Sequence, residues 1–113
     1  MTFNPHEYAQ GILDRNKQEQ KLIEQRLREA RKEADKLIEL LIRQAGCTRA
    51  VVFGSVKSGA VRNLHFDIDI AVWGGDIMEA QGIAFDSPFS VDIVDYELAP
   101  KHVKESIDRS LLL

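Results

Sequence analysis

The chain has 113 residues, of which 44% are hydrophobic and 29% are charged, and its formal net charge is −3. This length allows one small domain with a single core, and the composition excludes both a fibrous repeat and wholesale disorder. The slightly acidic balance excludes the broad basic surface of a general nucleic-acid-binding protein.

The first predicted element is one long helix, from about Asp14 to Gln44. This stretch contains neither glycine nor proline and consists mainly of strong helix formers. Pro5 and Gly11 place its start within the first fifteen residues, and Gly46 is its natural end.

Apolar side chains along this helix follow the alternating four-three spacing of a coiled-coil seam. The seam positions are Ile23, Leu27, Ala30, Ala34, Leu37 and Leu41. Before Ile23 the seam continues with polar residues, Asn16 and Gln20. Two interpretations stay open for this part: a solvated helix that extends from the domain, or a contact with another helix in a second copy or a different protein. We favour the contact, because a lone amphipathic helix has little else to stabilise it.

After Gly46 the pattern changes to short strands separated by turns and helices. Three strands are predicted, over residues 49–53, 67–73 and 91–96. The segments between them are predicted as a helical turn with a loop (56–66) and a short helix (76–84), and a last helix begins at Pro100. In the second strand, Ile68, Ile70 and Val72 should face the core while the other face is exposed.

Two aspartates open the second predicted strand. Asp67 and Asp69 are two residues apart, so their side chains leave the same face, ~6.6–7 Å apart along the chain. Adjacent carboxylates repel each other, which favours a bound cation, and oxygen ligands suit Mg²⁺. Asp92 is the candidate third carboxylate of a site for two metal ions, and it can act as general base for an attacking hydroxyl. For each aspartate alone, the competing interpretation is a strand-edge charge that faces water.

Gly54 and Ser55 end the first predicted strand and lead into a helical turn. Backbone N–H groups and a hydroxyl at a helix start form an anion site suited to a terminal phosphate. The competing interpretation is a plain turn with Ser55 as the N-cap. The conjunction of this turn with Gly59 and a following Asp-x-Asp motif is rarer than either motif alone, and it favours the phosphate site.

These residues resemble the signature of the DNA polymerase β-like nucleotidyltransferase superfamily, and the short length is similar to its minimal branch. The resemblance rests on Val51-Val52-Phe53-Gly54-Ser55, Gly59, Asp67-Ile68-Asp69-Ile70-Ala71-Val72 and Val91-Asp92-Ile93-Val94-Asp95. It covers about residues 37–113, which we take as the nucleotidyltransferase domain. Residues 1–36 are then a helical extension that the resemblance does not explain.

The resemblance implies an α+β fold, with a small mixed β-sheet flanked by helices and preceded here by the long N-terminal helix. It implies Mg²⁺-dependent transfer of a nucleoside monophosphate, with AMP from ATP as the expected case, to a hydroxyl while pyrophosphate leaves. Gly54 and Ser55 would hold the distal phosphates. Asp67 and Asp69 would hold two Mg²⁺ ions, and Asp92 would bind the second ion and help to deprotonate the acceptor.

The segment between the Gly-Ser turn and the aspartates differs from the family pattern. Family members usually carry a basic residue directly before the glycine matched by Gly59, whereas this chain has Ser58 there and Lys57 one step earlier. Lys57 or Arg62 can supply the missing charge or be a solvated surface cation, and we include Lys57 among the nucleotide-binding candidates. The segment is also one residue longer than the commonest spacing, and Phe66 replaces a small polar residue. These differences predict weakened catalysis at an intact metal site.

Members of the minimal branch are often paired with a helical HEPN-domain protein as toxin and antitoxin, and some of these antitoxins transfer AMP to a tyrosine of the toxin. The resemblance therefore implies an antitoxin-like nucleotidyltransferase that acts on a partner protein. The alternative is a weak or inactive module that binds and neutralises or scaffolds a HEPN-type partner. An antibiotic-modifying nucleotidyltransferase is least favoured, because the chain lacks the length for a helical acceptor domain.

The cysteine content and the terminal segments bear on the compartment. Cys47 is the single cysteine, which excludes an internal disulfide and fits the cytoplasm. No basic region is followed by an apolar run as in a signal peptide, and no apolar stretch approaches the ~20 residues of a membrane span. We expect a cytoplasmic protein that contacts neither a membrane nor nucleic acid in general.

Overall fold

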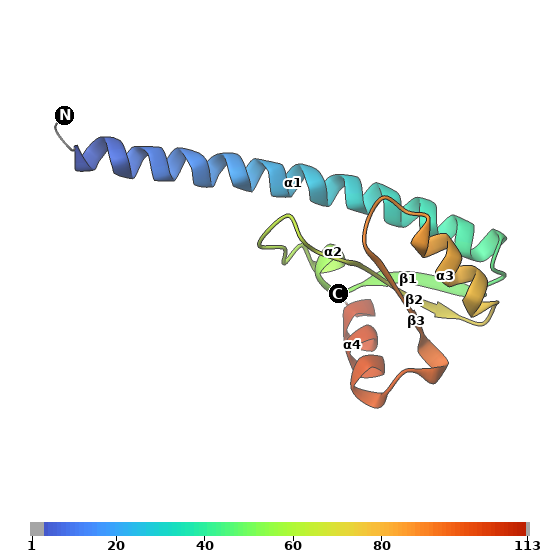
Figure 1. The fold of residues 1–113 in the computed structure, drawn as a ribbon. Helices are drawn as coiled ribbons and strands as arrows, with labels where there is room; N and C mark the ends of the chain where they lie inside the picture. Colours follow the sequence, from blue (N-terminus) through green and yellow to red (C-terminus); the bar gives the residue numbers. More distant parts are fainter. Residues whose placement is uncertain (1–3, 113) are drawn as a thin grey trace.

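The order of helices and strands agrees with the prediction (Figure 1). The structure, a computed structural model, describes residues 4–112, so the first three residues of the predicted extension and Leu113 lie outside the described part. The elements are α1 (Pro5–Arg43), β1 (Arg49–Phe53), α2 (Gly54–Ser58), β2 (Ile68–Trp73), α3 (Ile77–Phe85), β3 (Val91–Asp95), the 3₁₀ helix η1 (Tyr96–Leu98) and α4 (Lys101–Leu111). The α+β class and the long N-terminal helix are confirmed.

Helix α1 dominates the outline of the molecule. Asn4 caps it, because its side-chain oxygen accepts hydrogen bonds from the backbone N–H groups of His6 at 3.0 Å and Glu7 at 3.4 Å. The 39 residues of α1 span about 58 Å, close to the longest dimension of the molecule, 65 Å. Its N-terminal half extends beyond the other elements (Figure 1). Within residues 4–112, no helix is long and apolar enough to cross a membrane.

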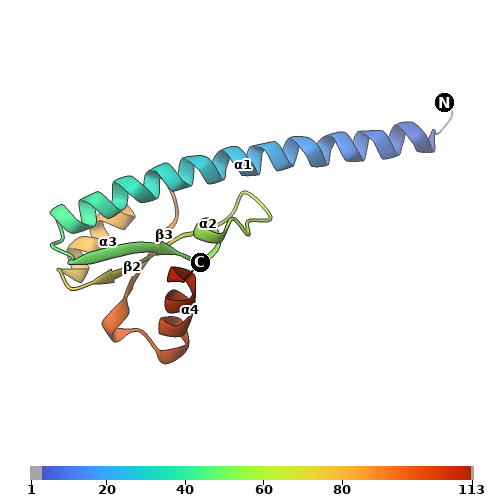
Figure 2. The same cartoon turned by 180° about the vertical axis from the view of Figure 1, so that it is seen from behind.

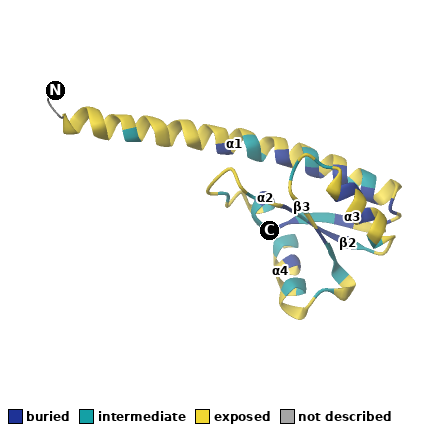
Figure 3. Cartoon of the chain, in the orientation of Figure 1, coloured by how far each residue is buried: buried dark blue, intermediate teal, exposed yellow. Residues whose placement is uncertain are grey.

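The predicted seam of α1 is buried inside its own chain. The buried residues of α1 are Ile23, Ala30, Ala34, Leu37 and Leu41. Four of these, all but Ile23, belong to the main core cluster with the sheet and α3, so the four-three spacing does not require a second helix there. No described residue before Ile23 is buried (Figure 3). Because α1 continues unbroken through residue 36, the boundary proposed there stays a prediction.

The three strands form one mixed sheet in the order β1-β2-β3. Strands β1 and β2 are antiparallel, and β2 and β3 are parallel, which confirms the mixed sheet. The register pairs Asp69 with Phe53 on one side and with Asp92 on the other. The sheet therefore brings the end of β1 and the acidic positions of β2 and β3 side by side.

The two faces of β2 are covered by different helices, which lie on opposite sides of the sheet (Figure 2). Ile68, Ile70 and Val72 are 0–1% exposed and belong to the cluster under α1 and α3, as predicted. The prediction of an exposed second face is wrong over most of the strand. Ala71 is fully buried there against Ile107 of α4. Asp69 and Trp73, at the two ends of that face, are half-buried, so α4 covers the middle of the face and its acidic end stays partly open.

Candidate functional site

The candidate site lies where the end of β1 meets the start of β2. Asp69 lies within β2 and is half-buried, whereas Asp67 directly precedes the strand and is exposed. Asp92 is exposed on β3, and its Cα is the register partner of Asp69. Neighbouring strands are about 4.8 Å apart, so the structure brings these two predicted site residues together. Burial of Ile68 and Ile70 fixes the register, because a slip of one residue would turn both away from the main core to the face that carries Asp69 and Ala71.

Gly54 is in direct contact with the central aspartate. It has φ +74°, and a Cβ atom placed there would lie 2.5 Å from the Oδ2 atom of Asp69. Both the backbone conformation and the close approach therefore require glycine at this position. The Gly-Ser turn and the Asp-x-Asp motif, twelve residues or more apart in the chain, form one site around this contact.

Asp69 is the carboxyl group of the site whose pKa is most clearly shifted. Burial, together with the negative charges of Asp92 and then Asp67, raises its pKa from an ordinary value of 3.8 to about 6. Burial disfavours the charged form, and nearby carboxylates add repulsion. The three predicted metal-site residues therefore interact electrostatically, and the site holds an excess of negative charge that a cation would neutralise.

The donor set suits a hard cation such as Mg²⁺, although its geometry is open. Among the described residues, no group of three His, Cys, Asp or Glu side chains is arranged to hold a metal ion. Mg²⁺ is commonly bound by one or two protein carboxylates while water and nucleotide phosphate complete its shell. Asp69 and Asp92, on paired strand positions, meet that smaller requirement, and Asp67 directly precedes the strand that carries Asp69.

Helix α2 begins at Gly54, which places Ser55 in its first turn. The N-cap position is Phe53, whose side chain has no hydrogen-bonding group, so Ser55 is not the N-cap. The backbone carbonyl oxygen of Ser55 accepts a hydrogen bond from the N–H of Gly59 at 2.8 Å. Gly59 has φ +82° and closes the helix in the left-handed conformation. The competing interpretation of Ser55 as a cap therefore does not hold, and Gly54 and Ser55 stay the phosphate-binding candidates.

Lys57 contacts a different part of the chain from the aspartates. Its ammonium group donates a hydrogen bond to the backbone carbonyl oxygen of Ser110, near the end of α4. Lys57 thus joins α2 to α4, and it would have to leave this partner to reach a phosphate. Its assignment to nucleotide binding stays a prediction. Arg62 and Ser58 are both exposed.

Arg31 of α1 is a supporting residue that the sequence did not indicate. Its Nε atom donates to the carbonyl oxygen of Val56 at 3.0 Å, and its Nη2 atom donates to that of Lys57 at 3.2 Å. These carbonyls belong to the short helix that follows the Gly-Ser turn. Because the pairs are 25 and 26 residues apart, no local motif predicts them. Helix α1 therefore supports the candidate site directly.

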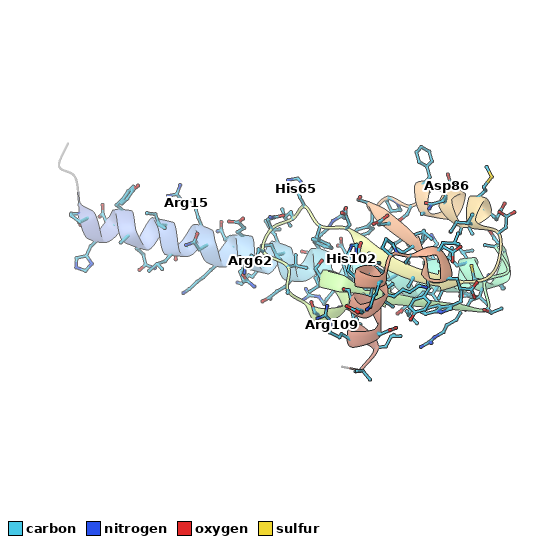
Figure 4. The ribbon with its side chains drawn as sticks, turned by 90° about the horizontal axis from the view of Figure 1, so that it is seen from below. Arg15, Arg62, His65, Asp86, His102 and Arg109 are labelled. Atoms are coloured by element: carbon cyan, nitrogen blue, oxygen red, sulfur yellow. The ribbon has the colours of Figure 1, made fainter. Side chains whose placement is uncertain are left out.

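A cavity of about 370 Å³ adjoins Asp67 on the side of α1, and neither Asp69 nor Asp92 lines it. Its lining residues are Arg26, Leu64, His65, Phe66, Asp67, Phe89 and Ser90. His65 belongs to the loop between α2 and β2, which approaches α1 (Figure 4). Among the predicted site residues, Asp67 lines this cavity and Asp92 does not.

Comparisons with known proteins do not identify a family for this chain. No family model matches the chain, and no curated protein matches it. The resemblance to nucleotidyltransferases therefore rests on the Gly-Ser turn, the aspartates and their placement on the sheet.

Proposed function

We propose that this protein is a Mg²⁺-dependent nucleotidyltransferase that transfers a nucleoside monophosphate, AMP from ATP in the expected case, to a hydroxyl group. The observation that carries the proposal is the contact of Asp69 with Gly54, combined with the influence of Asp92 and Asp67 on the pKa of Asp69. A glycine turn beside a cluster of repelling carboxylates suits a metal-bound polyphosphate.

In this proposal each part of the site has one task. Gly54 and Ser55 would bind the distal phosphates through backbone N–H groups and a hydroxyl, next to the carboxyl group of Asp69. Asp69, with Asp67 and Asp92, would hold Mg²⁺, which supplies positive charge to the phosphates when it is bound. The two basic side chains nearest in the chain and the fold already have backbone partners, Lys57 at the Ser110 carbonyl and Arg31 at the Val56 and Lys57 carbonyls, so the cation would provide most of the charge neutralisation.

Transfer of the nucleoside monophosphate forms one bond and breaks one bond at the α-phosphorus. The acceptor oxygen forms a bond to the α-phosphorus, and the bond from that phosphorus to the oxygen bridging toward the β-phosphorus breaks. Pyrophosphate leaves toward the Gly-Ser turn. The acceptor proton passes to the carboxylate of Asp92, which is exposed on β3, across β2 from that turn. This placement suits in-line attack, because the acceptor and the leaving group need opposite sides of the α-phosphorus.

A second candidate function is a binding module with little or no turnover. Two observations favour it: Lys57 is bound to the Ser110 carbonyl, and the position before Gly59 is an exposed serine. In this case the protein would bind a helical, HEPN-type partner and neutralise or scaffold it. Either function is compatible with an antitoxin-like role and with the projecting half of α1 as a contact surface.

Label transfer separates the two candidates. The purified chain is incubated with Mg²⁺, the HEPN-type partner and ATP labelled at the α- or the γ-phosphate. A nucleotidyltransferase moves only the α-label to protein, and the double variant Asp67→Ala plus Asp69→Ala abolishes that transfer. Transfer that survives in the double variant would disprove the metal-site assignment. A stable complex without transfer would favour the binding module.

A further inference from the structure

The cavity beside Asp67 combines three features that the nucleotidyltransferase resemblance does not explain. Arg26 comes from the N-terminal helix outside the resemblance. Leu64 and His65 come from the loop that is one residue longer than the common spacing, and Phe66 stands where a small polar residue is usual. These departures converge on one cavity of about 370 Å³, which is within the range of about 300–1,000 Å³ typical of small-molecule pockets.

The lining of this cavity suits a flat, partly polar ring. The guanidinium group of Arg26 lies 3.9 Å from the centroid of the Phe89 ring, which orients its plane within the wall. Phe66 is half-buried and packs against the main core cluster, so its ring is held in place. Guanidinium planes and aromatic rings are the surfaces on which nucleobases stack, and His65 and Ser90 add hydrogen-bonding groups.

The position of the cavity distinguishes between the two reactants of the proposed function. The acceptor hydroxyl would be deprotonated by Asp92, which does not line the cavity. Asp67 does line it, and Asp67 belongs to the group that would hold the phosphates through Mg²⁺. The half of a nucleotide that continues from its α-phosphate past Asp67 therefore reaches this cavity, whereas the acceptor has its own approach on the β3 side.

We propose that the cavity between α1, the loop before β2 and Ser90 binds the nucleoside half of the nucleoside triphosphate, with the base stacked against Arg26. The inference rests on the proposed function. It assigns to the N-terminal helix a direct part in substrate recognition. Residues 1–36 thus contribute to the nucleotide site in addition to any contact with a partner.

The test measures binding of two ligands that share the triphosphate and differ in the nucleoside. Calorimetric titrations with Mg²⁺-ATP and Mg²⁺-tripolyphosphate are made on the wild-type chain and on Arg26→Gln and His65→Ala. Arg28→Gln and His102→Ala are the matched controls, since both residues are exposed and neither lines the cavity. Thermal unfolding of each variant verifies that it is folded.

The proposal predicts that the wild type binds ATP more tightly than tripolyphosphate. Arg26→Gln should weaken ATP binding about tenfold, a factor that corresponds to about 1.4 kcal/mol, and should leave tripolyphosphate binding nearly unchanged. If Arg26 contributes only its positive charge, Arg26→Gln would weaken the binding of ATP and of tripolyphosphate equally. That result would overturn the stacking assignment. Equal affinities of the wild type for both ligands would overturn the nucleoside site while leaving the phosphate and metal site intact. Absence of binding for both ligands would instead contradict the proposed function, and this inference with it.

Discussion

At the scale of single residues, the site is defined by one contact between a glycine and a carboxylate. Gly54 and Asp69 are adjacent because the antiparallel register places Phe53 opposite Asp69 and the chain then turns into α2. The absence of a side chain at Gly54 makes room for the carboxyl group of Asp69. The same contact keeps Asp69 half-buried, which is why its pKa is raised mainly by burial. Stability and ligand binding therefore place opposite demands on Asp69, whereas both require glycine at position 54.

Gly54→Ala should destabilise the fold and disturb the site. The added methyl group would lie 2.5 Å from the Asp69 Oδ2 atom at a backbone φ of +74°. We expect a loss of about 1–3 kcal/mol in the free energy of unfolding, measured by urea denaturation, together with weaker Mg²⁺-ATP binding. The control is Gly82→Ala in α3, where a Cβ meets nothing within 4 Å. That substitution should stabilise by about 0.5–1 kcal/mol. Equal behaviour of the two variants would contradict the close approach.

Asp69→Asn should stabilise the protein at alkaline pH when no divalent cation is present. Because the pKa of Asp69 is raised from 3.8 to about 6, the folded state binds its proton more tightly than the unfolded state. The resulting stability is fully present below pH 3.8 and is lost as the pH rises through about 6. Since the side chain is half-exposed, solvent screening reduces the effect to the order of 1 kcal/mol.

Melting temperatures between pH 4 and pH 8 in EDTA provide the measurement. The wild type should lose stability over this range relative to Asp69→Asn, and Mg²⁺ should reduce the difference at pH 8. A variant that is less stable than the wild type at pH 8 in EDTA would show that Asp69 serves the fold. In that case the charge of Asp69 would stabilise the folded protein without a bound cation, contrary to its proposed role as a metal ligand.

Several site residues were predictable because their signals are local. Gly54 and Ser55 end an apolar strand, and Asp67 and Asp69 interrupt the next one at its start, so both motifs can be located from neighbouring residues alone. Ile68, Ile70 and Val72 alternate with them and are buried as expected. By contrast, burial of Ala71 under Ile107 depends on where α4 packs, and the sequence of β2 holds no sign of it.

At the scale of elements, α1 is connected to both sides of the site. Arg31 binds the carbonyl oxygens of Val56 and Lys57 in α2. On the other side, Ser87, in the segment before β3, donates a hydrogen bond to Glu33 of α1. The helix thus holds both the turn after β1 and the entry to β3, so movement of α1 would shift the two parts together.

Replacement of Arg31 tests this support. Arg31→Met removes two hydrogen bonds to backbone carbonyls, and we expect a loss of about 0.5–1.5 kcal/mol of stability. The amide of Gly59, bonded to Ser55 in α2, should exchange its hydrogen faster, as measured by NMR. Arg28→Met, on an exposed position of the same helix, is the control. Unchanged exchange at Gly59 in Arg31→Met would show that α2 keeps its conformation without α1.

The element contacts explain where prediction from sequence stopped. The strands and helices follow from periodicity, and most of their observed bounds differ by a few residues, whereas α1 begins at Pro5, well before the predicted Asp14. The seam of α1 was correctly identified as apolar, but periodicity cannot tell whether the covering surface belongs to the same chain. Here it is the sheet and α3. The contact of Lys57 with Ser110 spans 53 residues and has no local signature.

At the scale of the whole molecule, α1 combines a structural half and a projecting half. From Ile23 onward its buried residues support the core, whereas its described residues before Ile23 are exposed or, at Ile12, half-buried. The projecting half is therefore available for contact with a second copy or a helical partner, the prediction that stays open. Removal of this projecting half should therefore have little effect on the stability of the fold.

Deletion of residues 1–18 should change the melting temperature by no more than about 2 °C, since none of residues 4–18 is buried. Leu37→Ala, at a position only 2% exposed, should instead cost about 2–5 kcal/mol. Light scattering then compares the masses of the full and shortened chains, alone and with the HEPN-type partner. An unchanged mass in both cases would remove the projecting half as a contact surface, and loss of the folded state would show that it belongs to the domain.

The most direct test of the central claim is calorimetric titration of the wild type and Asp69→Asn with ATP, in the presence and absence of Mg²⁺. Asp86→Asn is the control, because Asp86 is exposed at the end of α3, away from the labelled residues of α4 (Figure 4). Asp69→Asn is expected to stay folded, so a lost affinity cannot be attributed to unfolding. The account predicts Mg²⁺-dependent ATP binding that Asp69→Asn weakens by about tenfold or more and Asp86→Asn leaves unchanged. ATP binding that does not require Mg²⁺, or that Asp69→Asn leaves intact, would contradict it.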